Sequence, residues 1–361
     1  MPSPDTSDSL NAARNVEQVE VEPATALDAT AWALLRAGDS RTALNCFREM
    51  LKINPFDSRA FKGLGYSFDL LGRKDDALYW YMKYKEANMQ IPEAHSDVIR
   101  AMLEAGQAER AASAAKQACS LFPGTPRFRY LVGRSHYELG DLETALSATK
   151  DAIEHEPATA EFWCFLGLVW ETLGDLEEAL KAYSRAEEID PRNGETVLGK
   201  AGVLRDLGRN AEYLEATSTA RRVYEQSGNR AGLVNAYWEE GWAYYVLRRW
   251  RESADASAKA VELKGELAPP RFNLGLALMR CGETERAKRE YLAAAELGDI
   301  GSLKTDGIND LEAALADDPA LEGASEILEV LKGRYLSLAK ERDEKVRMLR
   351  RRGRLVKKRR R

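Results

Sequence analysis

The side chains that most often carry out catalysis are scarce in this sequence, and none completes a catalytic pattern. The chain has three histidines, and Glu156 follows His155 without the second histidine that a zinc-binding HExxH helix requires. Gly63 and Gly65 begin a glycine motif for phosphate binding, but Phe68 stands where its third glycine would be. We therefore expect no catalytic residues, no metal and no cofactor, and we expect that the protein is not an enzyme.

The positions of lysine and cysteine support the same expectation. Lys200 follows Gly199, but neither the Ser/Thr nor the upstream glycine of a phosphate loop accompanies them. The four cysteines lie far apart and form no CxxC pair; they are Cys46, Cys119, Cys164 and Cys281. Isolated thiols of this kind are typical of reduced structural residues in a cytosolic protein.

Basic side chains are concentrated at the end of the chain, where they could bind a polyanion. Residues 345–361 hold eleven Lys and Arg and no acid, so the chain's net charge of −5 leaves −16 on residues 1–344. Such a block is typical of an interaction tail that contacts nucleic acid, an anionic lipid surface or a nuclear import receptor. The alternative is a solvated tail that shields an acidic body. The residues expected to contact a polyanion are Arg350, Arg351, Arg352, Arg354, Lys357, Lys358, Arg359, Arg360 and Arg361.

The elements that would position a binding surface are helical hairpins, and residues 160–193 are the clearest example. The first helix carries apolar or small residues at i, i+3, i+4 and i+7, which are Trp163, Leu166, Gly167 and Trp170. The lack of a side chain at Gly167 lets the two helix backbones approach closely. Gly174 is expected to end this helix in the left-handed conformation. Asp175 and Glu178 form a capping box for the second helix, which Pro191 ends.

This hairpin pattern recurs every 34 residues. The small-residue position recurs at Ala31, Gly65, Ile99, Gly133, Gly167 and Ala201, and the turn glycine at Gly38, Gly72, Gly106, Gly140, Gly174 and Gly208. The spacing resembles the tetratricopeptide repeat, a helical hairpin with the same aromatic, Gly, Ala and Pro positions. The resemblance implies an all-α fold, a right-handed superhelical solenoid of about eight hairpins with a C-terminal capping helix.

The pattern divides the chain into four regions. Residues 1–23 are expected to be a disordered acidic segment, 24–301 the solenoid, 302–344 capping helices and 345–361 the basic tail. The repeats are 24–57, 58–91, 92–125, 126–159, 160–193, 194–233, 234–267 and 268–301. In the seventh repeat, Arg248 replaces the turn glycine.

The capping region is expected to contain two helices, at residues 308–316 and 324–349, with Gly353 ending the second. The apolar stripe of that second helix consists of Ile327, Leu328, Leu331, Tyr335 and Leu338. A solenoid needs such a cap, so the stripe is expected to cover the end of the last repeat.

In the tetratricopeptide family the first helix of each hairpin lines a concave groove, and the resemblance implies two sets of groove residues here. The second to fourth repeats contribute Arg59, Lys62, Tyr66, Arg100, Arg127, Tyr130, Arg134 and Tyr137. The seventh and eighth contribute Trp238, Trp242, Tyr245, Phe272, Leu276 and Met279. Arginine beside tyrosine suits carboxylates or phosphates, and two tryptophans one turn apart suit an apolar anchor. We therefore expect a peptide ligand with an acidic part and an apolar part.

Each set also has a plainer explanation. Arg100 and Arg134 could balance the charge of an acidic body. Trp238 and Trp242 could pack against the extra residues 226–230 that precede the seventh repeat. The family's Lys/Asn clamp for a C-terminal carboxylate is not expected, because the positions of the first repeat do not match it.

The sequence as a whole favours a non-enzymatic scaffold or adaptor that binds a peptide or partner segment in its groove. The alternative is a factor associated with nucleic acid or an anionic surface, whose tail binds and whose repeats recruit a partner. There is no apolar run of membrane-spanning length and no secretory signal. We expect a cytoplasmic protein, or a nuclear one if the host is eukaryotic.

Overall fold

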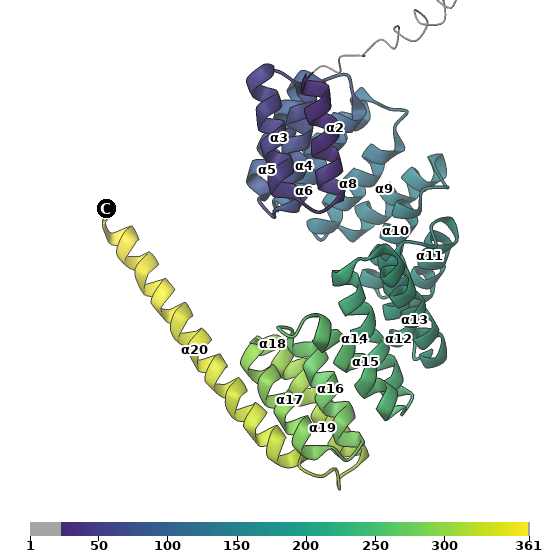
Figure 1. The fold of residues 1–361 in the computed structure, drawn as a ribbon, viewed down its shortest axis with the longest axis vertical. Helices are drawn as coiled ribbons and strands as arrows, with labels where there is room; N and C mark the ends of the chain where they lie inside the picture. Colours follow the sequence, from purple (N-terminus) through teal and green to yellow (C-terminus); the bar gives the residue numbers. More distant parts are fainter. Residues whose placement is uncertain (1–22, 360–361) are drawn as a thin grey trace, which may run out of the picture. The chain divides into compact units, whose positions relative to one another are not determined.

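The computed structural model describes residues 23–359, with side chains described up to residue 348, and the chain forms two compact units. The N-terminal unit is Met1–Pro157 and the C-terminal unit is Ala158–Arg361. Between residues 23 and 359 all regular elements are helices, with no β-strand (Figure 1). The expected all-α repeat fold is confirmed. The expected acidic segment 1–23 lies outside the described residues, apart from Pro23, which begins the first helix.

The N-terminal unit consists of helical hairpins stacked in chain order. Its helices are α2 (Pro23–Arg36), α3 (Ser40–Ile53), α4 (Ser58–Leu70), α5 (Lys74–Ala87), α6 (Pro92–Glu104), α7 (Ala108–Leu121), α8 (Pro126–Glu138) and α9 (Leu142–His155). Each helix packs against the next, and first helices of neighbouring hairpins also touch, as α2 does α4 and α6 does α8. The first helices therefore form one layer of the unit and the second helices another.

The C-terminal unit continues the same arrangement and then departs from it. Its hairpin helices are α10 (Ala160–Leu173), α11 (Leu176–Ile189), α12 (Gly194–Asp206), α13 (Asn210–Ser227), α14 (Arg230–Val246), α15 (Trp250–Leu263), α16 (Ala268–Arg280) and α17 (Thr284–Leu297). After them come α18 (Ile300–Ser302), the π-helix η1 (Leu303–Asn309), α19 (Asp310–Asp317) and α20 (Ala324–Arg359). The first helices α12, α14 and α16 contact one another in sequence.

The turns between paired helices use the left-handed backbone conformation that the repeated glycine predicts. Gly174 ends α10 with φ of 85°, and Asp175 then accepts a hydrogen bond from the backbone N–H of Glu178. Arg248 occupies the same turn position and is the one non-glycine residue with a positive φ (58°) among those described. A Cβ atom in this conformation crowds the following carbonyl, which costs roughly 1–2 kcal/mol.

Close helix packing depends on the small residues of the repeat. The ring of Tyr183 on α11 lies so near Gly167 on α10 that an added Cβ atom would stand 2.9 Å from it. Tyr291 and Gly275 repeat this arrangement between α17 and α16, where the distance would be 2.8 Å. The expected role of glycine at this position is confirmed, since alanine there would force the ring to move.

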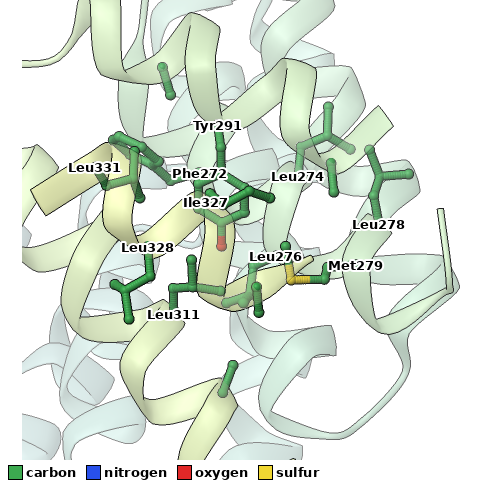
Figure 2. Close-up of a cluster of buried hydrophobic side chains, with 14 of the residues drawn as sticks. Phe272, Leu274, Leu276, Leu278, Met279, Tyr291, Leu311, Ile327, Leu328 and Leu331 are labelled. Carbon is green, nitrogen blue, oxygen red and sulfur yellow. The ribbon is translucent and has the colours of Figure 1, made fainter. Parts of the chain in front are cut away.

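The last hairpin is covered by a buried apolar cluster (Figure 2). Ile327, Leu328 and Leu331 of α20 are buried in it, together with Leu311 of α19. Their partners include Tyr291 of α17 and residues of α16 and η1, while Tyr335 and Leu338 are partly buried. The apolar stripe of α20 therefore covers the last hairpin.

Two helix boundaries differ from the sequence-based expectation. Helical backbone begins before the expected residue 308, because α18 starts at Ile300 and η1 follows it from Leu303. α20 continues to Arg359, so the prediction that Gly353 ends it is wrong. Glycine inside a helix costs only about 1 kcal/mol, which the flanking Arg and Leu residues, good helix formers, can offset. In the part of the chain that the structure describes, no helix could span a membrane.

Candidate functional site

The predicted groove residues of the N-terminal unit lie on the first helices α4, α6 and α8. We call this surface the basic face; it consists of Arg59, Lys62, Tyr66, Arg100, Arg127, Tyr130, Arg134 and Tyr137. At one end Arg59 forms an ion pair with Asp57, with 2.7 Å between Nη2 and Oδ2. Lys62 lies over the ring of Tyr84, with Nζ 5.5 Å from the ring centroid. These cations are therefore engaged by groups of their own unit.

Arg100 of the basic face is held by three hydrogen-bond acceptors. It donates hydrogen bonds to Asp69 (2.8 Å), to the hydroxyl of Tyr81 (3.1 Å) and to Glu104 (3.2 Å). Burial alone would raise the pKa of Asp69, but hydrogen bonds, including those from Lys74 and Arg100, hold this pKa below its usual value. The contacts of Arg100 agree with the plainer explanation, in which it balances acidic groups.

Asp97 adds a negative charge to the same surface. Its carboxylate lies 3.7 Å from Arg100, and its buried Oδ2 atom has no hydrogen-bond partner among the described residues. Burial raises the pKa of Asp97, although the charges of Lys62, Arg100 and Arg127 oppose this change. The basic face is thus less positive than its arginines alone suggest.

The aromatic residues of the basic face differ in exposure. Tyr130 is 1% exposed and its hydroxyl accepts a hydrogen bond from Arg134 at 3.1 Å, so the prediction that Tyr130 contacts a partner is wrong. Its ring lies in the core between helices. Tyr66 is 39% exposed and packs against Trp32 with ring centroids 5.7 Å apart, while Tyr137 is half-buried. Tyr66 remains available for contact.

Two of the predicted aromatic residues of the C-terminal unit, Trp238 and Trp242, line a hollow of about 290 Å³. We call it the aromatic hollow; its lining residues are Arg205 of α12, Trp238, Glu239 and Trp242 of α14, Asn273 of α16, Asp306 of η1 and Asp310 of α19. Trp242 stacks on Tyr245, with ring centroids 5.2 Å apart and an interplanar angle of 16°. Trp238 and Trp242 thus line a hollow shared by the first helices α12, α14 and α16 with η1 and α19.

Three further predicted groove residues are covered by the chain itself. Phe272 is 0%, Leu276 1% and Met279 3% exposed, and all three belong to the buried cluster drawn in Figure 2. A Cβ atom on Gly307 of η1 would lie 2.9 Å from the ring of Phe272. The prediction that these residues contact a partner is wrong, because η1 and α19 occupy their side of the last hairpin.

The carboxylates of the aromatic hollow differ in the hydrogen bonds that they accept. Glu239 accepts hydrogen bonds from the hydroxyl of Tyr213 (2.6 Å) and from Arg205 (3.2 Å). Asp306 accepts one from Thr305 (2.8 Å). Asp310 has no hydrogen bond or ion pair through its side chain among the described residues. Burial raises the pKa of Asp310 to about 7, and the neighbouring charge of Asp306 adds to this effect.

Sequence reasoning did not identify Arg205, Glu239, Asn273, Asp306 and Asp310 as site residues. One pattern could have indicated the last two. Asp306 and Asp310 are four residues apart, a like-charge spacing that destabilises an isolated helix. Their position beyond the last repeat placed them in the expected capping region instead.

The remaining predictions concern groups that the described residues do not settle. The side chains of the basic tail, Arg350 to Arg361, lie outside the described side chains, so polyanion binding stays a prediction from the sequence. Within the described residues, no cluster of three or more His, Cys, Asp or Glu side chains is arranged to hold a metal ion. Partner binding by the predicted groove residues that remain exposed also stays a prediction.

Comparisons with known proteins find similarity to tetratricopeptide repeat proteins. The model of the tetratricopeptide repeat family matches residues 29–90, 99–153 and 133–194. Among solved structures, the APC/C hetero-tetramer Cut9–Hcn1 is 16% identical with a TM-score of 0.54, over 90% of this chain and 58% of that one. A thermophilic tetratricopeptide repeat protein from Thermus thermophilus is 23% identical with a TM-score of 0.45, over 50% of this chain and 98% of that one. No curated protein sequence matches the chain.

Proposed function

Because this chain belongs to the tetratricopeptide repeat family, we propose that it is a non-enzymatic scaffold or adaptor that binds a peptide or partner segment along its first helices. The fold supports a protein-interaction role in general terms, since stacked hairpins offer an extended surface made of successive first helices. The proposal assigns the main contact to the aromatic hollow.

The observation that carries the proposal is the position of Trp238 and Trp242. Both are half-buried, line the same hollow and stand one turn apart on α14. Tryptophan in a partly covered pocket is the residue type that contributes most to protein interfaces, and exposed aromatic surface in a repeat array is typical of a binding site. A side chain of the partner would fill the hollow between α12, α14 and α16.

The basic face has a smaller role in this proposal. Arg59 keeps 44% of its side chain exposed and Arg100 keeps 34%, although both have acidic partners. Tyr66 offers exposed aromatic surface on α4, the helix that also carries Arg59. An acidic residue of a bound segment could share these guanidinium groups, but it would compete with Asp57 and Asp69 for them.

Affinity capture with the full chain, followed by mass spectrometry, would identify a partner whose affinity can then be measured by titration calorimetry. We expect Trp238→Ala to weaken binding by about 2 kcal/mol, roughly 30-fold, as for a central interface tryptophan. Tyr66→Ala should have a smaller effect. Tyr79→Ala is the matched control, because Tyr79 is an exposed aromatic residue (54%) on the second helix α5.

Circular dichroism and the thermal midpoint would show that each variant is folded. Loss of binding in Tyr79→Ala but not in Trp238→Ala would contradict the proposal, because the second helices would then carry the contact.

A further inference from the structure

The aromatic hollow has the dimensions and walls of a site for one long side chain. Its volume of about 290 Å³ is at the small end for ligand pockets, too small for a helix or a large cofactor. Two of its lining residues are tryptophans, and the others are polar or charged. An occupant must therefore combine an apolar stem with a polar end.

The charge of the lining residues determines which sign of charge the polar end of an occupant can carry. The lining has three carboxylates, of Glu239, Asp306 and Asp310, and one guanidinium, of Arg205, which gives a formal charge of −2 when all are ionised. Arg205 is already engaged by Glu239 and by Asp206, at 3.2 and 3.1 Å. It cannot also neutralise Asp310, whose carboxylate has no partner among the described residues. An anionic occupant would be repelled.

Asn273 is an independent indication that something belongs in the hollow. It is only 6% exposed, it lines the hollow, and its side-chain amide forms no hydrogen bond with any described residue. Its amide atoms are not among the fully buried polar atoms without a partner in the described part of the chain, so they open onto the hollow. The side-chain carbonyl of Asn273 can therefore accept a hydrogen bond from an occupant, as can the carboxylate of Asp310.

The tryptophans of the hollow also favour a cationic occupant. A cation over the face of tryptophan is attracted by the ring, by about 0.5–2 kcal/mol depending on how far it is desolvated. A purely apolar occupant would satisfy the tryptophans but would bury Asn273 and Asp310 without partners. Only a cationic donor on an apolar stem matches the rings, the amide and the carboxylates together.

We infer that the aromatic hollow binds the side chain of a lysine or arginine from a partner protein. The inference rests on the proposed scaffold function and specifies the chemistry of the bound segment. The ammonium or guanidinium would donate to Asp310 and Asn273 while its methylene stem packs between Trp238 and Trp242. Asp306 and Glu239 would supply further negative potential.

The test uses the full chain and acetylated, amidated pentapeptides of glycine with arginine, lysine or citrulline at the centre. Citrulline has nearly the shape of arginine but no charge. The ¹⁵N-indole signals of Trp238 and Trp242, assigned by single Trp→Phe variants, would report binding at the hollow. We expect the arginine and lysine peptides to shift both signals, and the citrulline peptide to bind about tenfold more weakly.

A matched pair of charge variants locates the site. Asp310→Asn should reduce the affinity for the arginine peptide about five- to tenfold. Glu312→Gln removes one negative charge from the same helix outside the hollow, where Glu312 pairs with Lys332 at 3.1 Å, and should leave this affinity unchanged. Equal binding of arginine and citrulline, or an unchanged affinity in Asp310→Asn, would overturn the inference.

Two further outcomes distinguish the cation site from the proposed scaffold function, and a partner protein from a second copy of this chain. If no cationic peptide shifts the indole signals while Trp238→Ala still loses a captured partner, the scaffold stands and the cation site is wrong. Deleting residues 345–361 should not change the two signals. A concentration-dependent change on deletion would assign the hollow to the tail of a second copy and overturn the assignment to a partner.

Discussion

The basic face of the N-terminal unit and the aromatic hollow of the C-terminal unit use charge in opposite ways. On the basic face the chain supplies its own counter-ions, as Asp69 and Glu104 do for Arg100. In the aromatic hollow Asp310 has no such partner among the described residues. A charged side chain thus indicates a binding site only where its neighbours leave it without a counter-ion.

The largest expected effect tests whether the charges of the basic face are structural. Arg100→Met would leave the partly buried carboxylates of Asp69 and Asp97 without their shared cation, and we expect unfolding to require about 2 kcal/mol less. Denaturant-induced unfolding followed by circular dichroism would measure this loss. The exposed Arg110→Met on α7 is the control and should change stability by less than about 0.5 kcal/mol.

A stability unchanged by Arg100→Met would break the comparison, because Arg100 would then be free to bind a partner. Adding Asp97→Asn to Arg100→Met should recover part of the loss, since Asp69 keeps its ion pair with Lys74 whereas Asp97 loses its cation.

The next effect concerns the aromatic hollow and depends on pH. The pKa of Asp310 is raised from 3.8 to about 7, so the folded chain holds this proton more tightly than the unfolded chain. Its contribution to stability is present at low pH and is lost as pH rises through about 7. Asp310→Asn should therefore be more stable than the unsubstituted chain at pH 8, by about 1–2 kcal/mol after allowance for solvent screening.

Thermal midpoints measured between pH 4 and pH 8.5 would check this prediction. The advantage of Asp310→Asn should grow up to about pH 7 and then stay constant. The charged groups that line the hollow with Asp310 are Asp306, Glu239 and Arg205. Asp310 also lines a second hollow, whose charged residues are Arg248, Arg280 and Asp317. Glu312→Gln on the same helix should show no such trend. An advantage that is the same at every pH would contradict the prediction, because ionisation of Asp310 would then not destabilise the folded chain.

The smallest effect compares one turn in the two units. Arg248 has φ of 58° where Gly140 of the N-terminal unit has φ of 77°. Arg248→Gly removes the crowded Cβ atom, and we expect a gain of about 0.5–1 kcal/mol in unfolding free energy. It also removes an exposed ion pair with Asp317 (2.8 Å), which contributes little.

Arg248→Ala is the control, because it removes the ion pair but keeps the Cβ atom. Differential scanning calorimetry should place it at or slightly below the unsubstituted chain, and Gly140→Ala should be destabilised by about 1 kcal/mol. Equal gains from Arg248→Gly and Arg248→Ala would attribute the effect to charge rather than to backbone conformation.

Most of the fold could be predicted because the repeat fixes local geometry at a constant spacing. Turn glycines such as Gly174 and contacts such as that between Gly167 and Tyr183 depend only on positions inside one hairpin. Some contacts between hairpins also follow the repeat. Arg59 donates a hydrogen bond to the hydroxyl of Thr25 at 3.4 Å, and the two residues are 34 apart, at the same position of the first helices α4 and α2.

The candidate site was less predictable, because it depends on residues outside the repeat. Phe272 occupies a groove position in the eighth repeat, but η1 covers it, and no periodic rule places η1 there. Asp310 reaches the hollow for the same reason. The partial exposure of Trp238 could be predicted from its position on a first helix. The acidic residues Asp306 and Asp310, which line the same hollow, could not.

The length of α20 has a consequence for the charges at the end of the chain. From Lys340 to Met348 its residues are exposed, and helical backbone continues to Arg359. At 1.5 Å per residue, the stretch from Lys340 to Arg359 is about 30 Å long, several times the distance over which salt screens charges in cells, about 8 Å. The helical backbone at Arg359 is therefore separated from Lys340 by more than the distance over which the charges of the same unit's hairpins act.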